Sequence, residues 1–394
     1  MAKKIKRYNR IYRGRRKKPV LRIILFILLA ALLVFLGFSL MQAISSLSSA
    51  PSGNSSSVSS GAVSTSSEGE SSTSSTSSTP SEPEKTVSGV VRELPRSSAG
   101  KEETLRAFAK NAAEQGASAL LLTLKDEAGY LHFSSANKTA KDAGALAADP
   151  VDLSMVAEVL KEENLELWVS LHCFRDTVAS RYLRKDGAVM FQTDEVLWLD
   201  NSASAGGVPW LNPFLPGAQN YNLSLVEEVC GLGADVVLLE SVQMPTRGAE
   251  NLMYLGGNGN SYSNVGTVLN QFVKAAEEAA AKKDGKVVCA VAGEYLYSTF
   301  VGNMVYGPDP FAVPSEYFAP SLRLSDLSGA KIGGSTLSLS DPKSAFSALF
   351  TDLAAKSGAE TGVPIVIAEG LSQEELTDIT AAAKNAGYPA LIIR

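Results

Sequence analysis

The longest part of this chain alternates between short apolar runs and helical segments. The clearest run is Val236–Leu239, which has four apolar residues without alternation and is followed at once by Glu240. A continuous run of this kind is typical of a strand buried on both faces, as in a parallel sheet. A carboxylate at the carboxyl end of such a strand stands where a (β/α) barrel places its chemistry.

Similar runs recur on both sides of this segment, with helical patterns between them. We expect eight strands, at Ser88–Leu94, Ala119–Lys125, Glu166–Phe174, Asp235–Val242, Lys286–Ala292, Tyr317–Leu324, Pro364–Ala368 and Pro389–Arg394. We expect helices at Glu102–Gln115, Asp152–Asn164, Tyr221–Leu232, Val265–Lys283, Pro342–Lys356 and Ser372–Ala386. Asp152 is a suitable N-cap, and Ser372 with Glu375 three residues later forms a capping-box sequence. This order predicts one (β/α)8 TIM barrel over residues 87–394, with an open doubly wound α/β sheet as the alternative.

The N-terminal part lacks this alternation. Residues 1–22 hold eleven Lys or Arg and no acid, and residues 23–41 are nineteen residues without charge. A helix of that length spans about 28 Å, close to the hydrocarbon thickness of a membrane. The basic flank predicts a cytoplasmic N-terminus, a single-pass transmembrane helix in the cell membrane and an extracellular C-terminal domain. A cleaved signal peptide is the alternative, and it would also export the domain.

Residues 42–86 connect the apolar segment to the barrel. Serine fills twenty of the forty positions from 45 to 84. A segment of this composition cannot bury a core, so we expect a disordered, flexible linker. The predicted organisation is therefore a cytoplasmic stub (1–22), a transmembrane helix (23–41), a linker (42–86) and the barrel (87–394).

Charge and cysteine content exclude several classes of function. Removing the eleven basic residues of the stub leaves 25 basic residues against 41 acidic ones, so the folded part is strongly acidic. This distribution argues against nucleic acid as a partner. Cys173, Cys230 and Cys289 lie in apolar surroundings and are expected to be reduced core residues. With only two histidines in the chain, we expect neither a metal site nor another cofactor.

Polar side chains follow most of the predicted strands, and the carboxyl ends of barrel strands converge on one face. Carboxylates among aromatic rings suit a sugar site, because two acids can act as general acid and as nucleophile or base while the rings stack on the sugar. The catalytic candidates are Glu240, Glu294, Asp126 and Glu369. The substrate-binding candidates are Glu127, His172, Arg175, Trp210, Gln243, Tyr295 and Arg323.

Several motifs, taken in order, resemble a known family. They are KDEAGYLHF, LWVSLHCFRD, WLDN, WLNPF, NYNLSLVEEVCGLGADVVLLESVQMP and EYFAPSL. Together they resemble the putative glycosyl hydrolase domain of exported Gram-positive bacterial proteins, a TIM-barrel family distantly similar to the α-amylase clan. The resemblance covers residues 87–394 and implies a barrel that acts on, or binds, a polysaccharide at the cell surface.

The resemblance also ranks the acids. Glu240 stands where family members usually have an aspartate after the fourth strand, and Gln243 stands where they usually have an arginine. The fourth and fifth strands supply the acid pair in the clan, which implies Glu294 as the first choice for the partner of Glu240. On the fifth strand itself the family typically has an acid where this chain has Val291. The leading hypothesis is therefore a membrane-anchored extracellular glycoside hydrolase-like domain that acts on a cell-envelope or extracellular polysaccharide. The alternative is an inactive barrel that binds glycan or serves as a cell-envelope scaffold.

Overall fold

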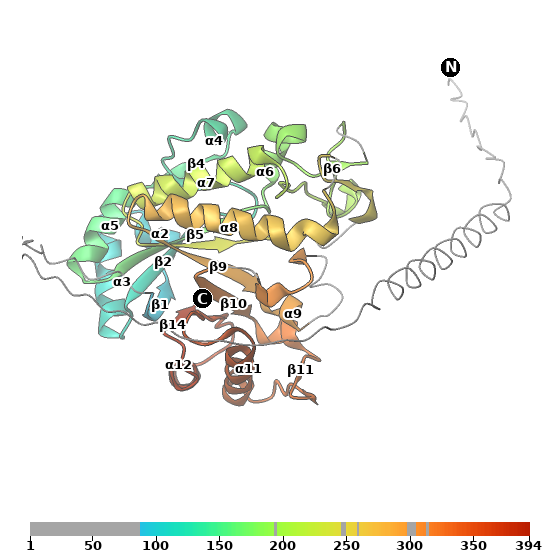
Figure 1. The fold of residues 1–394 in the computed structure, drawn as a ribbon. Coiled ribbons are helices and arrows are strands. Elements are labelled where there is room, and N and C mark those ends of the chain that lie inside the picture. Colours follow the sequence, from blue (N-terminus) through green and yellow to red (C-terminus); the bar gives the residue numbers. More distant parts are fainter. Residues whose placement is uncertain (1–86, 193–194, 246–249, 258–259, 298–304, 313–314) are drawn as a thin grey trace, which may run out of the picture. The chain divides into compact units, whose positions relative to one another are not determined.

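Eight parallel strands close into a barrel in the computed structural model (Figure 1). The structure describes residues 87–192, 195–245, 250–257, 260–297, 305–312 and 315–394. The barrel strands are β1 (Gly89–Glu93), β2 (Ala119–Lys125), β5 (Glu166–His172), β7 (Val236–Glu240), β9 (Lys286–Ala292), β10 (Tyr317–Leu322), β13 (Ile365–Val366) and β14 (Ala390–Ile393). Each pairs in parallel with the next, and β1 pairs with both β14 and β2. The predicted TIM barrel is confirmed, and the open doubly wound sheet is wrong.

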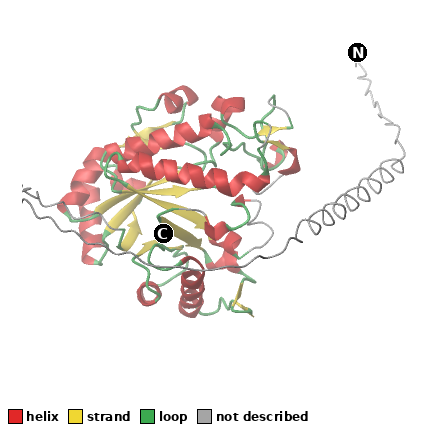
Figure 2. Cartoon of the chain, in the orientation of Figure 1, coloured by secondary structure: helices red, strands yellow, loops and turns green. Residues whose placement is uncertain are grey.

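All six predicted helices are present and lie outside the barrel strands (Figure 2). They are α3 (Glu102–Glu114), α5 (Leu153–Glu162), α7 (Pro216–Gly231), α8 (Val265–Ala281), α11 (Pro342–Ser357) and α12 (Gln373–Asn385). Asp152 caps α5 by accepting the Met155 N–H, and Ser372 and Glu375 form the capping box of α12. Helix α7 begins earlier than predicted, because Pro216 occupies its first turn, where a missing N–H costs nothing.

The apolar run of β7 serves two cores at once. Val236 and Leu238 point into the barrel and join an interior cluster with Val91, Leu121 and Trp168. Val237 and Leu239 point outward and pack in the large cluster between the strands and the helices. Both faces are therefore buried, which explains why the sequence shows no alternation. Because side chains on one face of a strand repeat every two residues, Glu240 also points into the barrel, next to Leu238 and at the carboxyl end of β7.

Segments inserted after the barrel strands were not predicted. After β2, the strands β3 (Leu131–Phe133) and β4 (Leu146–Val151) extend the sheet beside β2, and the helix α4 (Lys138–Ala143) connects them. The loop after β5 contains α6 (Thr177–Leu183) and β6 (Met190–Phe191), and β6 pairs with β8 (Met253–Tyr254). Val189, Trp198 and Trp210 form a small core of their own beneath this pairing. A hairpin, β11 (Lys331–Ile332) and β12 (Ser335–Thr336), follows β10.

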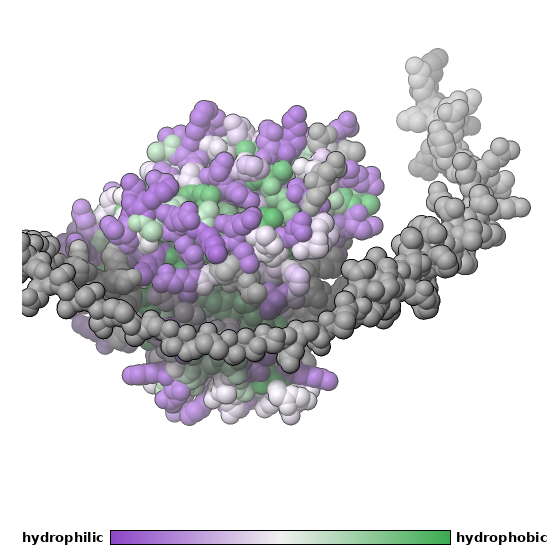
Figure 3. Space-filling model, in the orientation of Figure 1, coloured by the Kyte–Doolittle hydropathy of each residue, from purple (hydrophilic) through white to green (hydrophobic). Residues whose placement is uncertain are grey.

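Polar side chains dominate the face shown in Figure 3, with apolar residues set between them. Cys173, Cys230 and Cys289 are free and buried, as predicted. Within the described residues, no helix combines the length and apolar character needed to cross a membrane. The predicted transmembrane segment (23–41) and linker (42–86) lie outside the described residues.

Candidate functional site

A cavity of about 280 Å³ opens at the carboxyl ends of β5, β7, β9 and β10. It is lined by eight of the predicted site residues: Glu127, His172, Arg175, Trp210, Glu240, Gln243, Glu294 and Tyr295. Asp200, Ser241 and Tyr306 line it as well, and the small side chains of Ala290, Ala292 and Ser321 leave it room. The structure thus brings together side chains that lie up to 194 positions apart in the chain, from Glu127 to Ser321.

Several side chains hold the Glu240 carboxylate in this cavity. Its Oε1 accepts hydrogen bonds from the Ser170 hydroxyl and from the Arg394 guanidinium, the latter at 2.8 Å. The Nε2 atom of His172 lies 3.7 Å from the same oxygen. Among the described residues, none donates a hydrogen bond to Oε2. Ser170 and Arg394 therefore hold one oxygen of Glu240, and no described residue holds the other by a hydrogen bond.

The surroundings of Glu240 keep it ionised. Burial alone would raise its pKa, but the charges of His172 and Arg394 and the hydrogen bonds from Ser170 and Arg394 outweigh that effect, so the pKa of Glu240 lies below its ordinary value. Burial lowers the pKa of His172 below its usual 6.5. Of these two charges, that of Arg394 is permanent, whereas that of His172 is present only while its imidazole is protonated. Glu240 is suited to act as a base, a nucleophile or a charge stabiliser rather than as an acid.

The turn after β7 fixes the next polar groups. Ser241 has a φ of +53°, an uncommon backbone conformation for a residue other than glycine. Its hydroxyl lies 3.0 Å from Nδ1 of His172. Tyr306 donates its hydroxyl proton to Oε1 of Gln243 at 2.8 Å and accepts the N–H of Ala292 at 3.2 Å. Gln243 is therefore anchored from behind by a buried tyrosine.

The opposite wall is built from the loops that follow β2 and β5. Arg175 forms an ion pair with Glu127, and its guanidinium carbon lies 5.8 Å from the centre of the Trp210 ring. Asp200 accepts the Trp210 indole N–H at 3.0 Å and the Val208 N–H at 2.8 Å. The Arg175 guanidinium thus lies over the Trp210 ring, whose indole N–H is held by Asp200, and together they form one wall of the cavity.

Three predicted residues lie outside this cavity. Oδ1 of Asp126 accepts the N–H groups of Ala128, Gly129 and Tyr130, each at 3.0 Å, and Oδ2 lies 2.8 Å from Nε2 of His132. Both of its oxygens are thus used in shaping a turn. Arg323 and Glu369 form an exposed ion pair beside a separate hollow of about 210 Å³. The structure therefore does not bring Asp126 or Glu369 to Glu240, whereas Glu294 shares its cavity.

Sequence reasoning missed Ser170, Asp200 and Arg394. Ser170 lies in β5, two residues after the inward-facing Trp168, and Arg394 follows β14, two residues after the inward-facing Ile392. Because side chains on one face of a strand repeat every two residues, the sequence could have predicted that both point inward. Asp200 lies in the irregular loop after β6 and carried no periodic signal. Among the described residues, no group of three or more His, Cys, Asp or Glu side chains is placed to hold a metal ion.

Comparisons with known proteins agree with this architecture. Residues 94–299, just over half of the chain, match the family described as a putative glycosyl hydrolase domain. A search of curated proteins found no match. Among solved structures, the glycoside hydrolase domain of PgaB (BpsB) from Bordetella bronchiseptica is similar with a TM-score of 0.56 and 12% identity, over 78% of this chain and 94% of that one. This similarity shows a shared barrel fold.

Two further structures match less well. The catalytic domain of β-amylase from Paenibacillus polymyxa has a TM-score of 0.48 and 10% identity, over 77% of this chain and 92% of that one. A hypothetical protein from Ruminiclostridium thermocellum has a TM-score of 0.40 and 21% identity, over 47% of this chain and 90% of that one.

Proposed function

The chain belongs to the putative glycosyl hydrolase domain family, and on that basis we propose that its barrel hydrolyses a polysaccharide at the cavity around Glu240. The observation that carries the proposal is the state of Glu240. Its pKa is lowered, one of its oxygens is held by Ser170 and Arg394, and no described residue donates a hydrogen bond to the other. The same cavity also contains Glu294.

In this proposal Glu240 and Glu294 have different catalytic roles. Glycoside hydrolysis needs one carboxylate that acts as nucleophile or base and one carboxylic acid that protonates the leaving oxygen. Glu240 has the lowered pKa that the first role requires. Glu294, on the helical turn α9 (Gly293–Leu296) after the neighbouring strand β9, is the candidate for the second role. Tyr295, which also lines the cavity, offers a ring surface to the apolar face of a sugar.

Substitution of Glu240 tests this assignment. Wild-type protein should release reducing ends from at least one polymer in a panel of peptidoglycan, chitosan, cellulose and starch. Glu240→Gln keeps the shape of the side chain and removes its charge, so it should slow that release by about a thousandfold or more. Unchanged turnover in the variant would contradict the proposed role.

A second candidate function is glycan binding without turnover. It is favoured by the ion pair between Glu240 and Arg394, because a carboxylate whose pKa is lowered by a guanidinium is a weaker base and nucleophile. In that case wild-type protein would bind oligosaccharides, measured by calorimetry, and would release no reducing ends from any polymer of the panel.

We also propose that the barrel is held outside the cell by the apolar segment at residues 23–41. Its support is the sequence pattern: a basic stub, nineteen uncharged residues and a serine-rich linker. Protease treatment of intact cells should release the barrel. A barrel that stays protected until the cells are lysed would contradict this topology.

A further inference from the structure

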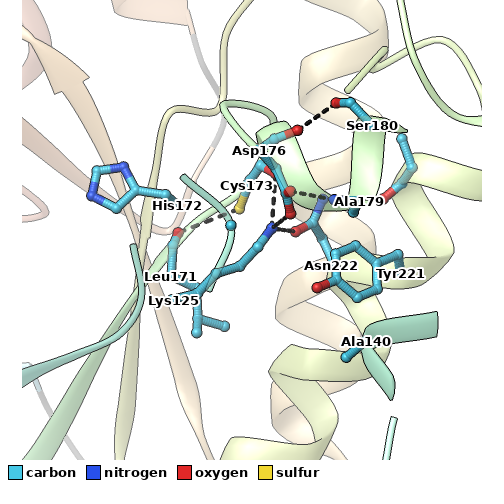
Figure 4. A network of polar contacts seen from close by, with 12 residues as sticks. Lys125, Ala140, Leu171, His172, Cys173, Asp176, Ala179, Ser180, Tyr221 and Asn222 are labelled. Atoms are coloured by element: carbon cyan, nitrogen blue, oxygen red, sulfur yellow. Dashed lines mark hydrogen bonds and ion pairs between the residues drawn. The ribbon is translucent and has the colours of Figure 1, made fainter. Parts of the chain in front are cut away.

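A second charged cluster lies behind the wall of the cavity, on the outer side of the barrel strands (Figure 4). Lys125 and Asp176 are both fully buried, and Nζ of Lys125 lies 2.8 Å from Oδ2 of Asp176. The ammonium group also donates to Oδ1 of Asn222 at 2.9 Å and to the Cys173 carbonyl at 3.1 Å. It lies 4.8 Å from the centre of the Tyr221 ring. His172 points away from this cluster, toward the cavity (Figure 4).

Stability alone does not explain such a cluster. Removing two charges from water costs free energy that their mutual attraction repays only in part, and apolar side chains of the same size often serve folding equally well. Three of the motifs that resemble the glycosyl hydrolase family meet here: KDEAGY supplies Lys125, HCFRD supplies Asp176 and NYNLSL supplies Asn222. None of these three side chains lines the cavity.

The cluster is connected to the cavity through two loops. Glu127 follows Lys125 by two residues, and Arg175 immediately precedes Asp176. The loops are joined directly, because the Thr177 N–H donates to the Ala128 carbonyl at 3.0 Å. Asp176 also caps α6 by accepting the Ala179 N–H at 2.7 Å. On the cavity side, the same loops end in the ion pair between Glu127 and Arg175.

Gly129 shows how closely the loops fit together. Its φ is +99°, and a Cβ at this position would lie 2.0 Å from Oδ1 of Asp176. Only glycine allows this conformation and this approach. The loop after β2 is thus folded tightly over the Asp176 carboxylate, which itself is held by Lys125.

We propose that Lys125 and Asp176, locked by Asn222, form a positioning pair that fixes the Glu127–Arg175 arm at the cavity. Arg175, which lies over the Trp210 ring, is then held in one orientation. In that orientation its N–H groups donate to the hydroxyl oxygens of a bound sugar. The arm's contact with a sugar rests on the proposed function, whereas the positioning of the arm does not.

A neutral variant of the pair tests this proposal. Lys125→Met with Asp176→Asn removes both charges, keeps the side-chain sizes and leaves an asparagine oxygen to cap α6. The matched control is Lys343→Met with Asp378→Asn, which neutralises an exposed ion pair with the same 2.8 Å separation between α11 and α12. Each protein carries 5-fluorotryptophan, and the ¹⁹F resonance of Trp210 is assigned with Trp210→Phe. Affinity is measured for cello-, chito- and maltohexaose.

The proposal predicts that the Trp210 resonance moves in the neutral variant as it does in Arg175→Ala, and stays in place in the control. Affinity for the hexaose that binds should fall about tenfold, the loss expected when a charged hydrogen bond is misplaced. Adding Arg175→Ala to the neutral variant should cause little further loss, because both changes remove the same arm.

A neutral variant that melts earlier but keeps the wild-type Trp210 resonance and affinity would overturn the proposal, since the pair would then be structural only. If the neutral variant does not fold, Asn222→Ala replaces it, and wild-type values there would also overturn the proposal. If no hexaose binds the wild-type protein and no polymer of the panel releases reducing ends, the proposed function fails. The Trp210 resonance still decides whether the pair positions the arm.

Discussion

Two ion pairs with the same N–O separation, one partly buried and one fully buried, lie on opposite sides of the barrel wall. Arg394 and Glu240 are 2.8 Å apart inside the barrel, and Lys125 and Asp176 are 2.8 Å apart outside it. Glu240 borders the cavity, and no residue in the described part of the chain donates a hydrogen bond to its second oxygen. Lys125 and Asp176, in contrast, are fully enclosed. Burial and charge alone therefore do not mark a reactive group. What distinguishes Glu240 is its access to an open cavity.

The largest effect on stability is expected at the enclosed pair. Lys125→Met alone leaves the Asp176 carboxylate buried without its counter-charge, which should lower the free energy of unfolding by about 3–5 kcal/mol. Urea denaturation followed by circular dichroism measures this change. The control is Lys343→Met, which removes one partner of a solvent-exposed pair and should leave the midpoint almost unchanged. Equal urea midpoints in the two variants would show that the Lys125–Asp176 pair contributes no more to stability than the exposed Lys343–Asp378 pair.

A smaller loss is expected at the open pair. Glu240→Gln removes the charge that faces Arg394, but the guanidinium keeps Thr123 at 3.2 Å and Glu93 at 3.6 Å as partners. The free energy of unfolding should therefore fall by about 1–3 kcal/mol. The same urea titration measures it. A loss as large as that of Lys125→Met would mean that Glu240 is primarily a structural residue.

The smallest effect concerns pH. Because burial lowers the pKa of His172, the unfolded chain binds a proton below pH 6.5 that the folded protein does not. Stability should therefore fall as the pH drops below about 6.5, by at most about 1.4 kcal/mol per pH unit for this one group. The charges that act on His172 are those of Glu240, Glu127, Arg394 and Lys125.

His172→Asn isolates this contribution. It keeps a polar atom near Ser241 and removes the titrating group, so the stability of the variant should depend less on pH between 6.5 and 5 than that of the wild type. Thermal melting at several pH values measures the difference. If the stability of wild type and variant depended on pH in the same way, the pKa of His172 would lie near its ordinary value. Burial would then not lower it.

The two pairs also show where sequence reasoning succeeded. Continuous apolar runs and capping residues were sufficient to predict all eight strands and six helices, because burial on both faces imposes a pattern that needs no tertiary knowledge. Glu240 was found by the same logic. Glu294 was predicted from its position after a strand and from the family resemblance, and it lines the same cavity as Glu240. The roles of both acids remain predictions.

The parts that were not predicted depend on contacts between distant segments. Asp126 could not be separated from Glu127 by sequence, since only the turn shows that Asp126 binds three backbone N–H groups while Glu127 reaches the cavity. Arg394 pairs with a residue 154 positions away. Lys125 lay in a recognised motif, but its enclosure by α7 and the loop after β5 is a property of the folded chain.

The most direct test of the account compares two acids that the sequence offered for the same role. Glu294 lines the cavity with Glu240, whereas Glu369 is paired with Arg323 outside it. Rates of reducing-end release are measured for Glu294→Gln and Glu369→Gln on the polymer that the wild-type protein cleaves. The account predicts a loss of about a hundredfold or more for Glu294→Gln and a change within about twofold for Glu369→Gln. A large loss in Glu369→Gln together with normal rates in Glu294→Gln would contradict it.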